Sequence, residues 1–397
     1  MDYDVDRVRA AFPALNDGTA YFDGPGGSQV PRQVAEAIAG TMLAGLSNRG
    51  TVTASERRAD EVVAGAREAI ADLLDCRPDG VVFGRSMTQL TFDLARALAK
   101  QWSPGDEVVV TRLDHDANIR PWVVAAEAVG ATVRWVDFDG GTAELQFDPD
   151  VLGARTRLVA VTGASNLLGT RPDLTAIASA VHDAGALLFV DGVHLTPHAS
   201  VSVQDLGADF YACSPYKFFG PHHGVLVADP ALWESVHPDK LLPSSNTVPE
   251  RFELGTLPYE LLAGTTAAVE FIAGVASAAG DRRTRVVESM RQVEEYEEEL
   301  FERLLAGLRS IEGVTVYGAP ARRTPTALFS VDAVPSERVY AALADRGVNA
   351  PASSFYAIEA SRWMGLGDGG AIRAGLAPYT TAAEVDRLLT AVAEVAQ

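Results

Sequence analysis

Lysine is rare in this chain, and one lysine lies where it could do chemistry. Among 33 lysines and arginines in 397 residues, only Lys100, Lys217 and Lys240 are lysines. Lys100 ends an amphipathic stretch and Lys240 lies in a polar loop, whereas Lys217 lies between a predicted strand and Gly220. Lysine, unlike arginine, can lose its proton inside a protein and can then form a Schiff base with an aldehyde. Lys217 is therefore a candidate nucleophilic amine.

An aspartate is predicted to lie near this lysine. Asp191 follows the predicted strand 186–190, and Lys217 follows the predicted strand 209–213. In open parallel α/β sheets, ligands bind beyond the carboxyl ends of the strands, so both side chains should reach one site. A carboxylate for a pyridinium nitrogen and a lysine for an aldehyde are the pair that pyridoxal 5′-phosphate (PLP) requires. We therefore predict a PLP site; the alternative is that Asp191 only caps a turn.

The start of the predicted helix 86–102 could bind the cofactor phosphate. The helix follows the predicted strand 81–83, and Ser86, Met87 and Thr88 open it. Free backbone N–H groups and the helix dipole favour an anion at such a start. Ser214 and Tyr216, beside Lys217, could add donors. Ordinary capping of the helix by Ser86 is the alternative, and no glycine-rich nucleotide motif is present.

Histidines and one arginine complete the candidate set. His115 follows the predicted strand 107–111 and could stack on a flat ring. Arg373 lies in the predicted strand 371–376, where a buried arginine needs an anionic partner, either a substrate carboxylate or an internal salt bridge. His194 and His198 have a spacing seen in metal sites, but Pro197 breaks the helix that would align them. No metal site is predicted.

The elements that must position these residues predict two domains. Short apolar strands alternate with helices between residues 81 and 228, as in a buried parallel sheet covered by helices. The run 224–228 is a further strand, for which an antiparallel direction is one option. Long helices at 261–278 and 282–311, followed by a few strands, predict a smaller α+β domain. The chain length also favours two domains.

Composition excludes several partners. The formal net charge is −20, which argues against nucleic acid and anionic membranes because both need a basic face. No apolar run approaches the length of about 20 residues that spans a membrane, and the first residues do not form a secretory signal. Cys76 and Cys213 provide no disulfide framework and fit a reducing cytoplasm. A cytoplasmic enzyme acting on a small molecule is expected.

The order of these motifs resembles the class V aminotransferase group of type-I-fold PLP enzymes, and most closely its cysteine-desulfurase-like branch. The matching stretches cover nearly the whole chain: 21–27, 48–50, 83–88, 114–122, 165–170, 191–194, 214–217 and 251–256. The resemblance implies a cofactor role for most of the candidates. It places His115 on the cofactor ring, Asn166 beside the cofactor, Asp191 at the pyridine nitrogen, His194 near the ring hydroxyl, Lys217 at the Schiff base, Thr256 at the partner subunit's phosphate, and Arg373 at the substrate α-carboxylate.

The resemblance also implies a fold and an assembly. The expected fold is α/β, the PLP-dependent transferase type-I fold, with a mainly parallel seven-stranded sheet between helices. Residues 21–270 would form the large PLP-binding domain and 271–397 the small α+β domain, with 1–20 packing on the small domain. The expected assembly is a homodimer with shared active sites.

Departures from the branch bear on the reaction. Desulfurases need a loop cysteine to take sulfur as a persulfide, and the corresponding stretch 347–357 has none. Tyr216 stands where desulfurases have a histidine before the lysine, and His222 and His223 follow without an assigned role.

The prediction is therefore a PLP-dependent enzyme that transforms an amino acid at Cα or Cβ, with Lys217, His115 and Asp191 as catalytic residues. Lyase or aminotransferase chemistry without a persulfide cysteine is favoured. The alternatives are an epimerase or cyclase of the same family, a true cysteine desulfurase, a nicotinamide-dependent dehydrogenase, and a non-catalytic PLP-binding protein.

Overall fold

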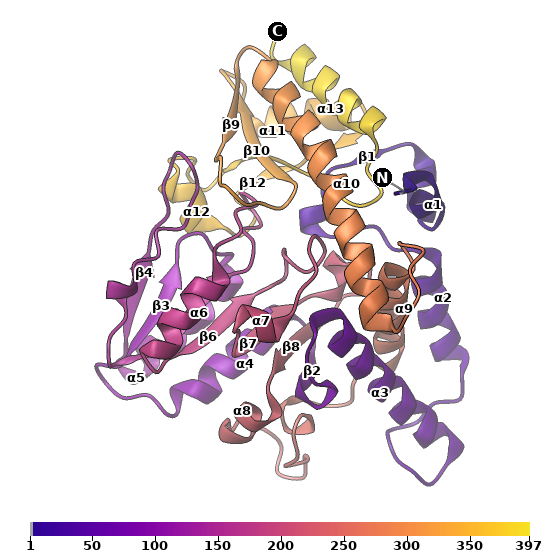
Figure 1. Cartoon of the computed structure of the whole chain (residues 1–397), viewed down its shortest axis with the longest axis vertical. Helices are drawn as coiled ribbons and strands as arrows, with labels where there is room; N and C mark the ends of the chain where they lie inside the picture. Colours follow the sequence, from indigo (N-terminus) through magenta and orange to yellow (C-terminus); the bar gives the residue numbers. More distant parts are fainter. Residues whose placement is uncertain (1–2) are drawn as a thin grey trace.

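A seven-stranded sheet forms the centre of the computed structural model, which describes residues 3–397 (Figure 1). The strand order is β2-β8-β7-β6-β5-β3-β4. Only β8 runs antiparallel to its neighbours β2 and β7, so the prediction of a mainly parallel seven-stranded sheet is confirmed. The strands are β2 (Val81–Gly84), β3 (Glu107–Thr111), β4 (Thr132–Val136), β5 (Thr156–Thr162), β6 (Leu187–Asp191), β7 (Phe210–Cys213) and β8 (Gly224–Ala228).

Helices cover both faces of this sheet. Because successive strand side chains point to opposite faces, neighbours such as Val159 and Ala160 enter different apolar clusters. One cluster joins the sheet to α3 (Ala54–Leu74), α6 (Leu174–Asp183) and α9 (Tyr259–Ala273). The other joins it to α4 (Met87–Ala99), α5 (Arg120–Val129) and α8 (Pro230–Ser235). The sheet is therefore buried on both sides, which explains its apolar strands.

A second sheet lies in the C-terminal part of the chain. Its antiparallel strands have the order β12-β13-β10-β9. They are β9 (Val314–Tyr317), β10 (Thr326–Val331), β12 (Ala352–Ser353) and β13 (Ala371–Gly375). The helices of this part are α10 (Arg282–Ser310), α11 (Ser336–Ala344), α12 (Ile358–Trp363) and α13 (Ala382–Val395). An apolar cluster from α10, α11 and α13 packs with this sheet, as an α+β arrangement requires.

The N-terminal part of the chain contacts both halves. After α1 (Val5–Ala10), strand β1 (Ala20–Tyr21) pairs in parallel with β11 (Val348–Asn349) near the small sheet. Helix α2 (Arg32–Leu43) then packs on α9. The long helix α10 packs on α9 at one end and on α13 at the other, as its course in Figure 1 shows.

Several element boundaries differ from the sequence predictions. Proline is favoured at the first helical position, so the sequence predicts a helix that begins at Pro31 and runs to about residue 46. In the structure Pro31 is instead the N-cap of α2, and α2 ends at Leu43. Helix α9 ends at Ala273, five residues before the predicted end, and a hydrogen-bonded turn at Gly274 follows. Helix α5 begins at Arg120 because residues 116–118 form a separate 3₁₀ turn. No helix within residues 3–397 has the length and apolar character to cross a membrane.

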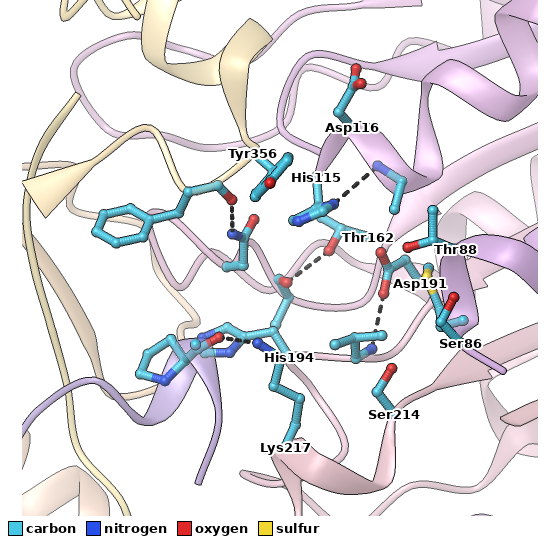
Figure 2. Close-up of a pocket in the computed structure, with 18 of the residues that line it drawn as sticks. Ser86, Thr88, His115, Asp116, Thr162, Asp191, His194, Ser214, Lys217 and Tyr356 are labelled. Atoms are coloured by element: carbon cyan, nitrogen blue, oxygen red, sulfur yellow. Dashed lines mark hydrogen bonds between the residues drawn. The ribbon is translucent and has the colours of Figure 1, made fainter. Parts of the chain in front are cut away.

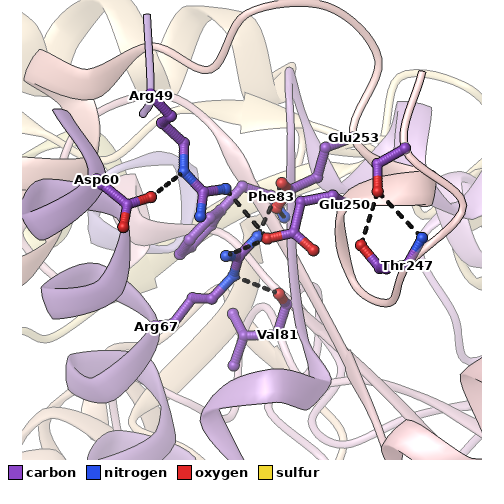
Figure 3. A network of polar contacts seen from close by, with 9 residues as sticks. Arg49, Asp60, Arg67, Val81, Phe83, Thr247, Glu250 and Glu253 are labelled. Carbon is purple, nitrogen blue, oxygen red and sulfur yellow. Dashed lines mark hydrogen bonds and ion pairs between the residues drawn. The ribbon is translucent and has the colours of Figure 1, made fainter. Parts of the chain in front are cut away.

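A buried ion-pair network stabilises one edge of the large sheet (Figure 3). Arg67 of α3 pairs with Glu253 at 2.8 Å and with Glu250 at 3.1 Å. Glu253 also accepts the backbone N–H of Phe83 in β2, at 3.1 Å. Glu250 pairs with Arg49 at 3.1 Å. The network therefore connects α3, β2, the loop that precedes α3, and the segment 250–253.

Candidate active site

The predicted site residues converge on one cavity of about 690 Å³ between the two sheets. It lies beyond the carboxyl ends of β6 and β7, as expected for a parallel sheet (Figure 2). All the predicted contacts except Thr256 line it: Ser86, Met87, Thr88, His115, Asn166, Asp191, His194, Ser214, Tyr216, Lys217 and Arg373.

Lys217 ends a 3₁₀ turn directly after β7, and its amine lies inside the cavity. Its Nζ donates a hydrogen bond to the carbonyl oxygen of Pro25 at 2.5 Å. Burial, together with the nearby Arg373 cation, lowers the pKa of Lys217 to about 7, although the Asp191 carboxylate opposes this shift. Much of this amine is therefore neutral near neutral pH, and a neutral amine can attack an aldehyde.

Asp191 is the last residue of β6 and is almost completely buried. One carboxylate oxygen accepts the backbone N–H of Val193 at 2.9 Å, and the other has no hydrogen-bond partner within residues 3–397. Burial raises the pKa of Asp191 to about 6, while the Val193 N–H and the Lys217 cation oppose the rise. A buried carboxylate with one free oxygen suits a positively charged ring nitrogen.

Two histidines face the cavity in neutral form. His115 Nδ1 accepts the backbone N–H of Ala117 at 3.0 Å, so the ring proton lies on Nε2. Burial, followed by the Lys217 and Arg373 cations, lowers the pKa of His115 to about 4. His194 Nε2 lies 2.9 Å from the hydroxyl of Thr326, and burial lowers its pKa well below the ordinary value.

The start of α4 lines the cavity and could serve as an anion-binding corner. Ser86 is the N-cap and its hydroxyl accepts the backbone N–H of Gln89 at 3.1 Å, so the capping alternative is observed. Capping leaves the first backbone N–H groups of the helix, those of Met87 and Thr88, without intrahelical partners, and both residues line the cavity. Strand β8 passes close by: a Cβ at Gly224 would lie 2.2 Å from the carbonyl carbon of Ser86. Only glycine lets the strand and this loop approach so closely.

Arg373 is a buried cation without a carboxylate partner. It lies in β13 with 2% exposure and forms no ion pair within residues 3–397, so the internal salt bridge is not found. Its Nη1 donates to the carbonyl oxygen of Asn166 at 2.8 Å, while its buried Nε has no partner. Burial lowers the pKa of Arg373 to about 9, against the attraction of Asp23. Arg373 Nη2 forms no hydrogen bond within residues 3–397, so this nitrogen could bind an anionic ligand in the cavity that Arg373 lines.

The remaining predicted residues lie elsewhere or have structural partners. Thr256 is exposed and does not line this cavity; its assignment concerned a partner subunit and stays a prediction. His222 is exposed and stacks on Tyr216, with centroids 4.7 Å apart. His223 is buried against the hydroxyl of Thr265 at 2.6 Å. His198 pairs with Glu297, and no cluster within residues 3–397 is arranged to hold a metal ion.

Sequence reasoning missed one wall of the cavity. Phe355 and Tyr356 line it from the small-sheet side, and Asp116 and Arg120 line its mouth. The stretch 347–357 drew attention only because it contains no cysteine. Its aromatic pair, which follows β12 closely, was the available signal.

The cavity has a suitable residue for each functional group of PLP. The cavity offers an amine of lowered pKa for an aldehyde, a buried carboxylate for a pyridinium, and a neutral imidazole for a ring face. It also offers helix N–H groups and hydroxyls for a phosphate. The unpaired guanidinium can bind a substrate carboxylate.

Comparison with known proteins gives the same result. The model of the family "Aminotransferase class-V" matches residues 20–388. The "uncharacterized protein MT3887" of Mycobacterium tuberculosis is 39% identical, with 100% of both chains covered. A cysteine desulfurase of Escherichia coli is 30% identical, with 100% of this chain and 99% of the relative covered. The crystal structure of the cysteine desulfurase CsdA of Escherichia coli superposes with a TM-score of 0.87 at 26% identity, covering 99% of this chain and 98% of the other. The chain therefore belongs to the class V aminotransferase family, in its cysteine-desulfurase-like branch.

Proposed function

We propose that the chain is a PLP-dependent enzyme that transforms an amino acid at Cα or Cβ, as a lyase or an aminotransferase. PLP is the cofactor of this family and of this chain. The observation that carries the proposal is the meeting of Lys217, Asp191 and Arg373 in one cavity. When bound, PLP supplies a conjugated ring that withdraws electrons from the substrate Cα.

Each of these side chains has a defined task in the proposal. Lys217 would provide the amine that holds the cofactor aldehyde. Once the amine of the substrate has displaced it, the freed Lys217 amine would take and return the proton at the substrate Cα. Asp191 keeps the ring nitrogen protonated, and His115 covers one face of the ring. Arg373 orients the α-carboxylate, and this orientation decides which Cα bond lies perpendicular to the ring and breaks.

The two cysteines speak against persulfide chemistry. Cys213 is completely buried in β7, and burial raises its pKa. Cys76 lies after the end of α3 and packs against the core; burial, with a smaller contribution from the Asp75 carboxylate, raises its pKa to about 12. Among the residues that line the cavity there is no thiol. A sulfur acceptor needs an accessible thiolate, which neither residue offers.

Cysteine desulfuration remains the second candidate because relatives of this chain bear that name. In that case, the thiolate of Cys76 or Cys213 would take the sulfur of cysteine as a persulfide and alanine would be released; a thiol reductant would then free sulfide from the persulfide. The amino-acid panel described below therefore includes cysteine with alkylation of any persulfide.

We also propose a homodimer with shared active sites. The segment before α3 carries strongly exposed apolar residues, namely Leu43 at 88% and Val52 at 82%, and Leu254 at 52% lies on a neighbouring segment. The Arg49–Glu250 ion pair connects these two segments. Thr256 follows Leu254 closely, so the hydroxyl of Thr256 would lie near a partner subunit that binds to this surface.

The domain division 21–270 and 271–397 is part of the same proposal, supported by the two separate sheets. The apolar cluster of the large sheet also takes in residues of α10 beyond position 270. The parallel pairing of β1 with β11 supports packing of residue 20 on the small domain, whereas Phe12 packs against Phe219 and Phe271 in the cluster of the large sheet. Two free cysteines support a cytoplasmic location.

The test is product analysis with a panel of amino acids on the PLP-loaded protein. On cysteine, alanine together with an alkylated protein persulfide indicates desulfuration, whereas pyruvate together with sulfide indicates elimination. Formation of the matching α-keto acid indicates transamination, and exchange of the Cα hydrogen without another product indicates epimerisation. Lys217→Ala should abolish both turnover and the absorption band of lysine-bound PLP, while Lys240→Ala, at a loop lysine, should change neither. Full turnover in Lys217→Ala would contradict the proposal.

A further inference from the structure

We propose that Tyr356 is a specificity-determining residue that contacts the substrate side chain and favours amino acids with apolar or aromatic side chains. This inference rests on the proposed function, because it concerns the same cavity and an amino-acid substrate. Tyr356 lies between β12 and α12 and lines the cavity mouth.

The ring of Tyr356 lies over His115 and remains open on its other side. The two ring centroids are 5.5 Å apart with an interplanar angle of 25°, so the rings are stacked. Tyr356 is nevertheless 75% exposed. Figure 2 shows its side chain beside His115 at the edge of the cavity. A large aromatic surface therefore lies next to the proposed reaction site and is not buried in the core.

The backbone that carries this ring adopts an unfavourable conformation. Phe355 and Tyr356 both adopt left-handed backbone angles, with φ of 52° and 59°. Aromatic residues rarely adopt this region, and strained residues of this kind cluster at functional sites. Each carbonyl is held from the large-sheet side: Asn166 Nδ2 donates to Phe355 at 2.9 Å, and the backbone N–H of Asp116 donates to Tyr356 at 2.7 Å.

The helix after Tyr356 is fixed to the cavity rim as well. Glu359 of α12 pairs with Arg112 at 3.2 Å. The guanidinium of Arg112 lies 4.8 Å from the ring centroid of Trp135 and 5.2 Å from that of Trp363. Trp363 Nε1 in turn donates to the carbonyl oxygen of Phe138 at 2.8 Å. Tyr356 is thus a fixed part of the cavity mouth.

The charged side chains at the cavity mouth already pair with one another, which favours a substrate with an uncharged side chain. Asp116 and Arg120 form an ion pair at 3.0 Å, and Arg120 also lies 3.7 Å from Glu359. A charged substrate side chain would therefore meet charges that already have partners. The other lining residues at this end include the apolar Phe92 and Ala117. An uncharged apolar or aromatic side chain that lies on Tyr356 leaves every pair intact.

Binding of α-methyl amino acids to the PLP-loaded protein tests the inference, because these analogues have no Cα hydrogen to lose. Calorimetry would give Kd for α-methylphenylalanine, 2-aminoisobutyrate and α-methylaspartate. We expect the wild type to bind α-methylphenylalanine about 2- to 12-fold more tightly than 2-aminoisobutyrate, the range of an aromatic pair, and α-methylaspartate least tightly. Tyr356→Ala should remove the preference for the aromatic analogue, and Tyr356→Phe should keep it. Tyr340→Ala, on α11 outside the cavity, is the matched control and should behave as the wild type.

Several results would overturn the inference. If Tyr356→Ala keeps the preference for the aromatic analogue, Tyr356 does not contact the substrate side chain. If the variant binds all three analogues equally more weakly, Tyr356 only holds His115 in position. A loss in Tyr356→Phe as large as in Tyr356→Ala would assign the effect to the hydroxyl. Failure of every analogue to bind a wild type that shows the bound-cofactor band would instead overturn the proposed function, and this inference with it.

Discussion

Arg373 and Asn166 are directly joined across the two sheets. Arg373 Nη1, in the small sheet, donates to the backbone carbonyl oxygen of Asn166 at 2.8 Å, and the side-chain amide of Asn166 donates to Phe355 at 2.9 Å. The guanidinium carbon of Arg373 lies 3.7 Å from the ring centroid of Phe355. Asn166 and Phe355 thus hold the guanidinium in place, and its buried Nε has no hydrogen-bond partner within residues 3–397.

Arg373→Gln should weaken binding of amino acids far more than binding of amines. The substitution removes two charge-assisted hydrogen bonds to the α-carboxylate, so we expect about a 100-fold increase in Kd for an amino acid. The corresponding amine without a carboxylate should bind the wild type and the variant alike. Spectral titration of the PLP-loaded proteins measures both, with Arg373→Lys as an intermediate variant. Equal effects on amine and amino acid would show that Arg373 only supports Asn166.

The rate at which the apoprotein captures PLP should depend on pH through Lys217. The attacking amine must be neutral, and the pKa of Lys217 is lowered to about 7 by burial and by the Arg373 cation. The neutral fraction, and with it the capture rate, should rise about tenfold between about pH 6 and about pH 8 and then level off. Stopped-flow absorbance follows the reaction, with Lys240→Ala as control. A rise that continues tenfold per pH unit above pH 8 would indicate an ordinary lysine.

Asp114→Asn should make stability less sensitive to pH. Asp114 is completely buried and accepts hydrogen bonds from the hydroxyl of Thr111 and, at 2.7 Å, from the amide of Asn118. Burial, with a smaller contribution from the Asp191 charge, raises its pKa to about 8. Since the folded-state pKa lies above the unfolded value, the folded state binds more protons between about pH 4 and about pH 8. Stability should therefore fall as pH rises through this window.

Asparagine has the same shape and does not titrate, so the variant lacks this fall. Relative to the wild type, it should gain about 1 kcal/mol or more between pH 5 and pH 9. Calorimetric melting of the apoproteins at both pH values measures the difference. Asp183→Asn, at an exposed position, is the control. A difference between Asp114→Asn and the wild type that does not change with pH would contradict the assignment.

Glu253→Ala should destabilise the protein much more than loss of an exposed carboxylate. It leaves Arg67, whose side chain is 8% exposed, without its closest partner, and it also frees the backbone N–H of Phe83. Breaking a buried pair of this kind costs about 3 kcal/mol. Asp386→Ala removes the partner of Arg303, where both side chains are about half exposed, and should cost less than about 1 kcal/mol. Urea denaturation midpoints measure both, and equal shifts would show that the network is not effectively buried.

The sequence predicted those parts of the site that depend on local pattern. Apolar strands are visible as short β-branched runs, and the rule that ligands lie beyond their carboxyl ends brought Asp191 and Lys217 together. The wall formed by Phe355 and Tyr356 could not be found in this way. Their left-handed backbone falls at residues other than glycine or asparagine, and their partners Asn166 and His115 lie far away in the sequence.

Helix ends were predicted less well for a related reason. Pro31 carried the expected start signal, but it caps α2 from outside. The apolar spacing of α9 continues past its end into a turn that packs against the core, so periodicity alone could not place the boundary. Tertiary contacts, which are distant in sequence, decided these positions.

The close approach of Gly224 to Ser86 restricts which residues can occupy position 224. Two parts of the chain build the proposed anion-binding corner. The start of α4 offers the N–H groups, and Gly224 in the antiparallel strand β8 leaves room for the loop before α4. A methyl group on the strand would push the loop aside without altering any residue of the loop itself. The geometry of the proposed phosphate corner therefore also depends on a residue of β8, outside the loop itself.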